Sequence, residues 1–334
     1  MAPTCLTRKR QSMAFTSPIP PSFKAGRGNP PLRTPMIMTD LLEIEKPDIE
    51  PGIGPSMLRG LPQHEQAMIF QKLSPLQRHL SRYLTVGGFP ELALSKDELF
   101  AQRAMRDDVV DKVLKRDIPA LYNIRSVADL EKIFLYLCYN SSSVISMDTI
   151  SSELEGVTRP TVEKYIRYLE SANLIYVSNP ADLSGKKILK AQPKIYIADA
   201  AIRNAVIMHE DILTDPVEMG IVAETAVYKH VRAFYRRVGA NVGYHRGKNR
   251  DKEICIVVDY LRNRVLIEVK YREHYSLGEK DLIVSESSQA GNALLVTKRG
   301  DDYGPLLACG DVYRIPAYAF LYLLGHSEKN GGAL

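Results

Sequence analysis

Apolar residues recur at helical spacing over most of 61–125. Met68 and Leu73 belong to this pattern, which a Gly-Gly pair followed by a proline interrupts after residue 86. A further helix is predicted over 97–115. It should end before Pro119, because the residue that precedes a proline disfavours the helical conformation. We therefore expect a helical linker region over 61–125.

Three helices followed by two strands are predicted over 126–208. The apolar stripes and the Ile- and Tyr-rich runs place them at 127–139, 147–154, 159–172, 174–177 and 194–197. Ser146 and Thr158 are expected to cap the second and third helices, because a hydroxyl can accept a hydrogen bond from an otherwise unpaired helix amide. Three helices and a hairpin are typical of a winged helix-turn-helix, whose third helix is sized for the major groove of DNA.

Residues 252–271 alternate as two strands joined by a short polar turn. The second strand ends in Glu-Val-Lys, so strand periodicity places Glu268 and Lys270 on one face and Val269 on the other. A Mg²⁺-dependent phosphodiesterase needs such a pair, with the carboxylate as a hard oxygen ligand and the lysine beside water or phosphate. The alternative is a surface ion pair on an edge strand.

A long helix over 217–237 precedes this hairpin and carries Glu224 among small and apolar residues. Burial on one side of that helix would let Glu224 face a cleft. A short strand near 242–244, the hairpin, a polar helix over 277–285, a strand over 293–297 and a final helix over 318–324 complete the region. A helix, three strands, a helix and a strand indicate an α/β core over 217–326.

Composition adds little to the prediction of partners and location. Of the 334 residues 45% are hydrophobic, and Lys plus Arg exceeds Asp plus Glu by 44 − 39 = 5. This mild basic excess permits nucleic-acid binding without requiring it. The four cysteines are far apart without zinc spacing, so a reduced cytoplasmic protein is expected. Neither a secretory signal nor an apolar run of membrane-spanning length is apparent, so no membrane partner is expected.

Residues 1–60 hold many of the twenty prolines and few periodic apolar positions. A segment of this kind offers little apolar surface to offset the entropy of ordering it. We expect much of it to be loosely ordered.

Basic residues on the third predicted helix and on the loop between the two strands, the wing, are the candidates for DNA contact. Phosphate contacts would fall on both elements. The candidates there are Arg159, Thr161, Lys164, Arg167, Lys186 and Lys187, and a basic turn near the hairpin adds Arg246 and Lys248. The alternative is that the unit is a protein-interaction module with a solvated basic helix face.

Several motifs in this order resemble those of archaeal and bacterial AAA-type ATPases that carry a C-terminal domain of unknown function (DUF4143). The resemblance covers about residues 80–324. It rests on Gly-Gly-Phe-Pro-Glu at 87–91, Lys-Arg-Asp-Ile at 115–118, Pro-Lys-Ile-Tyr-x-x-Asp at 193–199 and the Glu-Val-Lys strand. It implies a multidomain α+β protein: a helical region, a winged helix-turn-helix, and an α/β domain like the restriction endonucleases of the PD-(D/E)XK fold. Residues 1–60 would then be a remnant of the end of the ATPase core.

Two departures from the family change the expected function. The phosphate-binding loop G-x-x-x-x-G-K-[ST] is missing, so we expect no ATP binding of that kind and no ATP hydrolysis. The aspartate that binds metal in the nuclease fold is replaced by Cys255, and a soft thiolate does not substitute for a hard oxygen on Mg²⁺. Glu253, two residues earlier on the strand, could rescue the site only if the strand shifted.

The resulting expectation is a DNA-binding protein with a vestigial nuclease-like site, in which Glu224, Glu268 and Lys270 hold the catalytic positions and Glu224 and Glu268 are the metal ligands. No cofactor is certain, and Mg²⁺ would be needed only if the nuclease were active. Two alternatives stay open: a Mg²⁺-dependent DNA nuclease, and a non-catalytic scaffold that binds an intact ATPase relative. DNA is the expected partner, with a homo-oligomer also compatible with the sequence.

Overall fold

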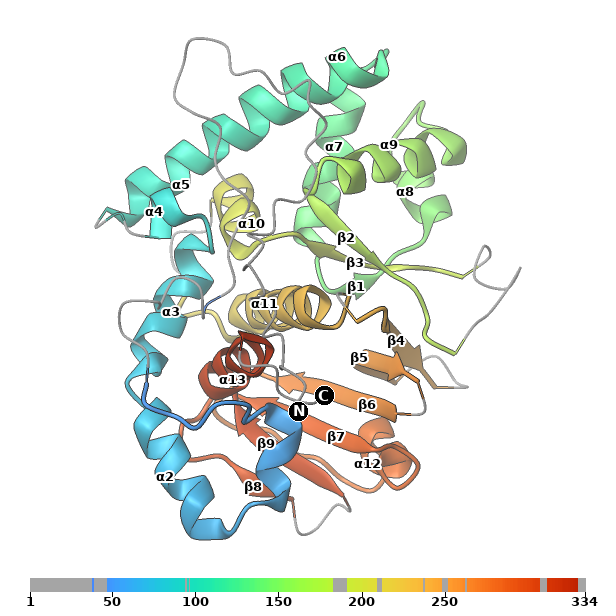
Figure 1. The fold of residues 1–334 in the computed structure, drawn as a ribbon. Coiled ribbons are helices and arrows are strands. Elements are labelled where there is room, and N and C mark those ends of the chain that lie inside the picture. Colours follow the sequence, from blue (N-terminus) through green and yellow to red (C-terminus); the bar gives the residue numbers. More distant parts are fainter. Residues whose placement is uncertain are drawn as a thin grey trace, which may run out of the picture. The chain divides into compact units, whose positions relative to one another are not determined.

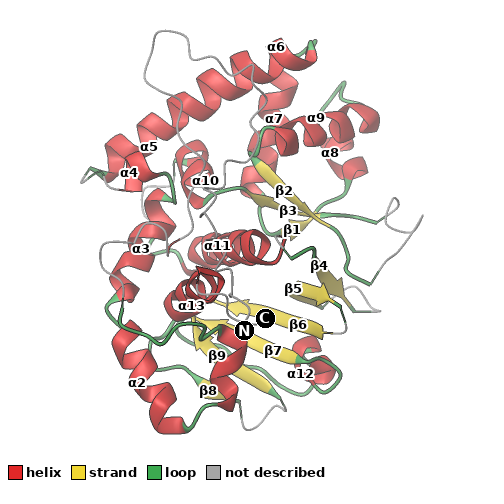
Figure 2. Cartoon of the chain, in the orientation of Figure 1, coloured by secondary structure: helices red, strands yellow, loops and turns green. Residues whose placement is uncertain are grey.

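The computed structural model describes residues 38, 47–93, 95, 97–182, 191–208, 212–236, 238–247, 252–261, 263–306 and 311–329. All of them lie in one compact unit, Arg33–Leu334. The architecture is mixed α/β, with a three-stranded and a six-stranded β-sheet, called here the small sheet and the large sheet (Figure 2). Among the described helices, none is both long enough and apolar enough to cross a membrane.

Of the first described elements, the first three pack against α13 (Ala317–Lys329), which covers the large sheet, and the fourth packs on the third and on the next helix. The four are the 3₁₀ helix η1 (Pro55–Gly60) and the helices α2 (Gln63–Leu73), α3 (Leu76–Val86) and α4 (Pro90–Ala93). Ile49 and Leu58 belong to the main hydrophobic core, which also contains residues of α2, α3 and the last hundred residues. These two side chains therefore bury apolar surface against the rest of the fold.

The next helix continues through Pro119, so its predicted end was wrong. It consists of α5 (Glu98–Arg106), a π-helical stretch η2 (Asp107–Asp117) and α6 (Ile118–Tyr122). Ile118 keeps a helical conformation, and its N–H bonds to the carbonyl of Val113 five residues earlier. The wider π turn gives the proline ring the room that an α-helix would deny it. The helix ends at Asn123, which has a left-handed conformation (φ 48°).

The small sheet has the strand order β1-β3-β2, with antiparallel pairing throughout. Its elements are α7 (Val127–Tyr139), β1 (Ser143–Val144), α8 (Met147–Glu153), α9 (Arg159–Ser171), β2 (Ile175–Ser178) and β3 (Lys194–Ile197). Ser146 caps α8 as predicted, since its hydroxyl accepts from the Thr149 amide. Thr158 precedes α9 but makes no side-chain cap bond, because its hydroxyl pairs with that of Thr161 at 3.0 Å.

The large sheet has the order β4-β5-β6-β7-β9-β8. Strand β5 pairs antiparallel with β4 and with β6, whereas β6, β7 and β9 run parallel and β8 returns antiparallel to β9. The elements are α10 (Ala200–Ile207), α11 (Pro216–Arg236), β4 (Asn241–Arg246), β5 (Glu253–Tyr260), β6 (Asn263–Lys270), α12 (Leu282–Ser287), β7 (Asn292–Thr297), β8 (Gly304–Pro305), β9 (Val312–Pro316) and α13 (Ala317–Lys329). The predicted hairpin is confirmed, whereas the polar helix predicted at 277–285 begins five residues later.

Helices cover both faces of the large sheet (Figure 1). Ile267 of β6 belongs to the core shared with α11, α13, α2 and α3, and its neighbour Leu266 belongs to a second cluster with Ile283 of α12. Alternate side chains of one strand thus serve opposite faces, as strand geometry requires. The helix α11 lies over the large sheet and beside the small sheet (Figure 1). Its Glu224 contacts β3 of the small sheet and lines a pocket with residues of β5 and β6.

A β-bulge interrupts β5 next to the predicted site. Gly243 pairs with Val257 and His245 pairs with Ile254, so both Cys255 and Ile256 stand opposite Tyr244. A bulge of this kind redirects the side chains around it. It is a local shift of the strand that carries Glu253 and Cys255.

Backbone pairing also joins the end of β2 to the edge of the large sheet. The Tyr244 amide donates to the Asn179 carbonyl (3.1 Å), and the Ala181 amide donates to the Tyr244 carbonyl (2.8 Å). Gly243 makes this approach possible, because a Cβ there would lie 2.3 Å from the Asn179 carbonyl oxygen. The base of the predicted wing is therefore anchored to β4.

Candidate functional site

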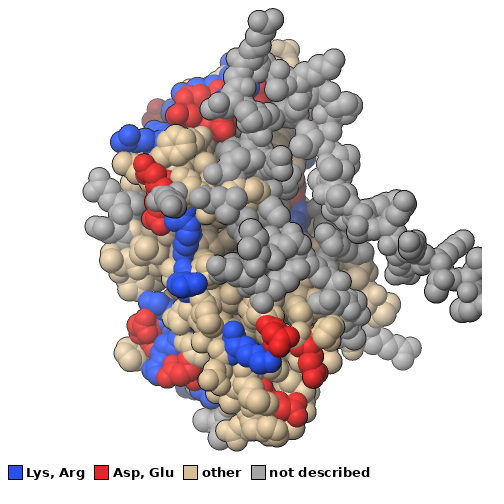
Figure 3. Space-filling view, turned by 60° about the vertical axis from the view of Figure 1, so that its left-hand side comes forward, with Lys and Arg blue, Asp and Glu red and all other residues tan. Residues whose placement is uncertain are grey.

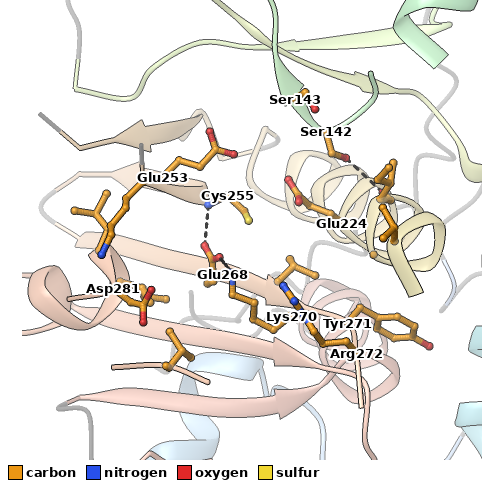
Figure 4. A pocket seen from close by; sticks show the side chains of 18 of the residues that line it. Ser142, Ser143, Glu224, Glu253, Cys255, Glu268, Lys270, Tyr271, Arg272 and Asp281 are labelled. Atoms are coloured by element: carbon orange, nitrogen blue, oxygen red, sulfur yellow. Dashed lines mark hydrogen bonds and ion pairs between the residues drawn. The ribbon is translucent and has the colours of Figure 1, made fainter. Parts of the chain in front are cut away.

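A pocket of about 540 Å³ lies where α11, β5, β6 and α12 meet the loop before β1. Glu224 enters it from α11, across from Glu253, Cys255 and Glu268 on the strands, with Lys270 beside Glu268 (Figure 4). The structure thus brings all of the predicted nuclease-site residues into one pocket. Glu268 and Lys270 share a strand face, as strand periodicity predicted.

Lys194 is the residue that most changes the interpretation of this pocket. It lies on β3, the central strand of the small sheet, and is 0% exposed. Its ammonium Nζ lies 2.8 Å from Oε1 of Glu224 and 2.6 Å from Oε1 of Glu253. One buried cation therefore bridges two carboxylates from α11 and β5.

The surroundings of Lys194 keep its amine charged. Burial by itself lowers the pKa, but the negative charges of Glu224 and Glu253 raise it by more, and the net change is upward. The sequence analysis did not select Lys194. A lysine in an otherwise apolar central strand was the available signal, because a fully buried lysine requires a charged partner.

Tyr196, two residues further along β3, contacts the same carboxylate oxygen of Glu224 as Lys194. Its hydroxyl lies 3.0 Å from Oε1 of Glu224 and 3.1 Å from the carbonyl oxygen of Cys255. The ring stacks on Tyr228 of α11 with centroids 3.9 Å apart. The small sheet therefore supplies two of the groups that fix the Glu224 carboxylate.

Glu268 is held by groups of the large sheet. Its Oε1 accepts from the Lys270 ammonium at 2.6 Å, and its Oε2 accepts from the backbone amide of Cys255 at 3.2 Å (Figure 4). For Lys270, burial lowers the pKa, and the charge and hydrogen bond of Glu268 raise it by more, so the net change is upward. Lys270 is therefore a cation that neutralises Glu268.

Cys255 lines the pocket as a neutral thiol. It is only 6% exposed, and burial raises its pKa well above the ordinary value, with the charges of Glu224 and Glu268 adding to the effect. A thiolate is the form that binds metals and attacks electrophiles. The thiol is therefore a poor ligand and a poor nucleophile at neutral pH.

These donors do not fit Mg²⁺. That ion needs several hard oxygen ligands in near-octahedral geometry. Here two carboxylates share the Lys194 ammonium, the third is paired with Lys270, and the remaining position holds a thiol. Within the described ranges, no three His, Cys, Asp or Glu side chains are placed to hold a metal ion.

Cations and hydroxyls missed by the sequence analysis also line the pocket. Ser142 and Ser143 lie above Glu224, and Arg272 lies beyond Lys270 (Figure 4). Ser142 has a left-handed backbone (φ 63°), and its hydroxyl lies 3.3 Å from that of Thr225 on α11. No sequence signal pointed to the two serines, since only the packing of this segment against α11 brings them to the pocket.

The four predicted DNA-contact residues of α9 differ in exposure and in the side chains that they contact. Arg159 is exposed but forms ion pairs with Asp148 (2.7 Å) and Glu163 (3.0 Å). The Lys164 ammonium lies 5.6 Å from the centre of the Tyr168 ring. Arg167 is exposed, whereas Thr161 is half-buried. Lys164 and Arg167 are therefore the two basic side chains best placed to meet a phosphate.

The remaining basic candidates fall mostly elsewhere. Lys186, Lys187 and Lys248 lie outside the described residues, and Arg246 is half-buried on β4. Figure 3 shows acidic and basic side chains close to one another on the described part of one face of the molecule. On that face, charge of both signs is mixed.

Comparison with known proteins gives matches to parts of the chain. A family model described as a domain of unknown function (DUF8612) matches residues 77–212. An uncharacterized protein of Haemophilus influenzae is 27% identical over 127 residues, which are 37% of this chain and 31% of that protein. The uncharacterized protein MJ1544 of Methanocaldococcus jannaschii is 24% identical over 217 residues, which are 64% of this chain and 46% of that protein. The matches span less than half the length of both relatives. The residues matched by the family model include the Gly-Gly-Phe-Pro-Glu and Pro-Lys-Ile-Tyr-x-x-Asp motifs.

Proposed function

We propose that this chain is a DNA-binding protein related to the AAA-type ATPases, with a winged helix and a nuclease-like domain that does not cleave DNA. Topology supports the winged helix. The chain runs helix, strand, helix, helix, strand, strand through α7, β1, α8, α9, β2 and β3, and the sheet order is β1-β3-β2. In such a unit α9 is the helix that enters the major groove.

Topology also supports the nuclease-like domain. A helix, three antiparallel strands, a helix and a fourth strand parallel to the third are formed by α11, β4, β5, β6, α12 and β7. The pocket at the junction of these elements contains Glu224, Cys255, Glu268 and Lys270. These are the positions that the family resemblance assigns to the metal-dependent site.

The observation that carries the DNA-binding proposal is the exposed pair Lys164 and Arg167 on α9. They lie three positions apart on the helix and hence on neighbouring parts of one face. Cations so placed can neutralise phosphates without any metal, and such contacts dominate non-specific affinity. Arg159 contributes less, because DNA would have to compete with Asp148 and Glu163 for its guanidinium.

Fluorescence anisotropy with a labelled random duplex, measured over a range of salt concentrations, tests this proposal. Binding should weaken steeply with salt, and Arg167→Ala and Lys164→Ala should each weaken it several-fold and reduce the salt slope by about one. Arg103→Ala is the matched control, since Arg103 is an exposed cation on α5 and should leave binding unchanged. Equal losses in all three variants would contradict a role for α9.

A nicking assay distinguishes the nuclease alternative. Supercoiled plasmid should remain intact with Mg²⁺ or Mn²⁺ even at high protein concentration. Nicking by the purified chain that Glu268→Ala abolishes would establish the nuclease and refute the non-cleaving assignment.

The ion pairs of Arg159 favour one further candidate function, a protein-binding scaffold. A helix whose first-turn arginine is neutralised by its own chain presents a less basic face to DNA. Under this hypothesis the chain would co-purify with an intact ATPase relative from the same cell and would show no salt-dependent binding to duplex DNA.

A further inference from the structure

We propose that Lys194 is a built-in cation that takes the place of a divalent metal ion between Glu224 and Glu253, and that it fastens the small sheet to the large-sheet region. The inference concerns this pocket alone and holds whether or not the chain binds DNA. Its starting point is the mismatch between the nuclease-like topology and a donor set that does not fit Mg²⁺.

The geometry assigns the cation position to the ammonium. Nζ of Lys194 lies within 2.8 Å of one oxygen from Glu224 and within 2.6 Å of one from Glu253. These two carboxylates come from α11 and β5, and the ammonium enters between them from β3. A hydrogen-bonding cation at such distances satisfies the same oxygens that a metal would need.

Charge and burial make this arrangement hard to exchange. A buried ammonium next to two carboxylates is stabilised by them, and without them Lys194 would be a desolvated, unpaired charge. Lys194 is 0% exposed, so an incoming ion could not simply displace it into water. Metal binding would require the small sheet to move away from α11 and β5.

Other contacts oppose that movement. Arg203 of α10, which is 1% exposed, donates to Glu218 of α11 at 2.6 Å. The backbone pairing of Asn179 and Ala181 with Tyr244 holds the end of β2 on β4. The ammonium is thus attached to a strand that these contacts hold in place, whereas a metal ion would be free to dissociate.

Binding of Mn²⁺ to the full chain, followed by electron paramagnetic resonance, tests the proposal directly. The wild type should bind no Mn²⁺ at this pocket. Lys194→Met, which removes the charge and keeps most of the volume, should lower the unfolding temperature in metal-free buffer. It should also bind Mn²⁺ at least about tenfold more tightly than the wild type, and Mn²⁺ should restore part of the lost stability.

Controls assign any effect to the carboxylate pair. Adding Glu253→Gln to Lys194→Met should abolish the gained Mn²⁺ binding. Lys132→Met, at an exposed lysine of α7, should change neither stability nor Mn²⁺ binding. If Lys194→Met does not fold, Lys194→Arg replaces it, because this variant keeps the charge and should fold without gaining Mn²⁺ binding. The Mn²⁺ titration of the wild type then still tests whether the pocket binds a metal ion.

Three results would overturn the proposal. The first is stoichiometric Mn²⁺ binding by the wild type that Glu224→Gln removes. The second is a folded Lys194→Met protein that is destabilised yet gains no Mn²⁺ binding, and the third is a Lys194→Met protein as stable as the wild type. None of these readouts depends on DNA, so failure here and failure of the DNA-binding proposal are distinguishable.

Discussion

Oδ2 of Asp199 lies 2.6 Å from Nζ of Lys229, and both residues are buried. The Asp199 carboxylate also accepts hydrogen bonds from the amide of Gly88 (3.2 Å) and from that of Ala201 (2.9 Å), the second of which caps α10. Lys229 donates in turn to the hydroxyl of Tyr83 at 2.8 Å. The pair therefore joins α3, α10 and α11 and brings together the Gly-Gly-Phe-Pro-Glu and Pro-Lys-Ile-Tyr-x-x-Asp motifs.

Loss of the Asp199 charge should destabilise the fold severely. Asp199→Asn leaves the Lys229 ammonium buried without its counter-ion, and breaking a buried pair costs about 3–5 kcal/mol. Urea unfolding of the variant measures this loss. Asp301→Asn removes the partner of Arg299 in an exposed pair and should cause no measurable change. Equal stability of the two variants would refute the role assigned to the Asp199–Lys229 pair.

Gly87→Ala should be more damaging than the same change at another left-handed glycine. Gly87 has φ +74°, and an added Cβ would lie 1.9 Å from Oδ1 of Asp199. Gly156 has φ +79° with nothing within 4 Å, so Gly156→Ala meets only the conformational penalty of about 1–2 kcal/mol. The unfolding temperature should decrease from wild type to Gly156→Ala to Gly87→Ala. The Gly87→Ala variant should lose roughly 3 kcal/mol or more of the free energy of unfolding. The reverse order would show that the turn at Gly87 can move away from Asp199.

His230 should make stability fall on acidification. Nδ1 contacts the Ala226 carbonyl, and Nε2 accepts from the Met38 amide, so the buried ring is neutral. Burial, then the charge of Lys229, lowers the pKa of His230 from 6.5 to about 3. The unfolded chain therefore takes up a proton that the folded chain does not. The stabilisation is fully present above pH 6.5 and is lost as the pH falls toward 3, at about 1.4 kcal/mol per pH unit.

Unfolding curves at several pH values compare His230→Gln with His64→Gln for this effect. His64 is largely exposed, so its replacement should leave the pH slope unchanged. His230→Gln should flatten the slope between pH 6 and 4 while lowering stability at neutral pH. A slope unchanged by His230→Gln would show that other groups cause the acid sensitivity.

Gly243→Ala should release the base of the predicted wing from β4. The new methyl group would collide with the Asn179 carbonyl, a backbone atom that cannot rotate away. Hydrogen exchange at the Ala181 amide, which donates to Tyr244, should accelerate by an order of magnitude or more. Gly278→Ala, at a glycine with open space around it, is the control. Equal protection of the Ala181 amide in both variants would contradict the clash.

Local sequence patterns predicted most of the elements. The strands over 252–271 and the helix α7 were placed within a residue or two, because their periodicity and apolar runs are strong. The passage of the helix through Pro119 was missed. It depends on a π-helical stretch, for which the proline rule gives no warning.

The site was predictable only for the residues on α11 and the large sheet. Glu268, Lys270 and Glu224 were found from strand parity and from a carboxylate on an apolar helix, and they do share a pocket. Lys194 was missed because its partners are on α11 and β5, distant in sequence. The bulge at Cys255 and Ile256 was missed for a similar reason, since it exists only relative to β4.

The pairing of Asn179 and Ala181 with Tyr244 also bears on assembly. An open sheet edge offers unpaired amides and carbonyls to a strand from another molecule. At β4 the chain uses those groups of Tyr244 itself. At the opposite edge β8 is only two residues long and contains Pro305, which has no amide hydrogen to donate. Both edges of the large sheet are therefore partly closed to strand addition by a second copy or an ATPase relative.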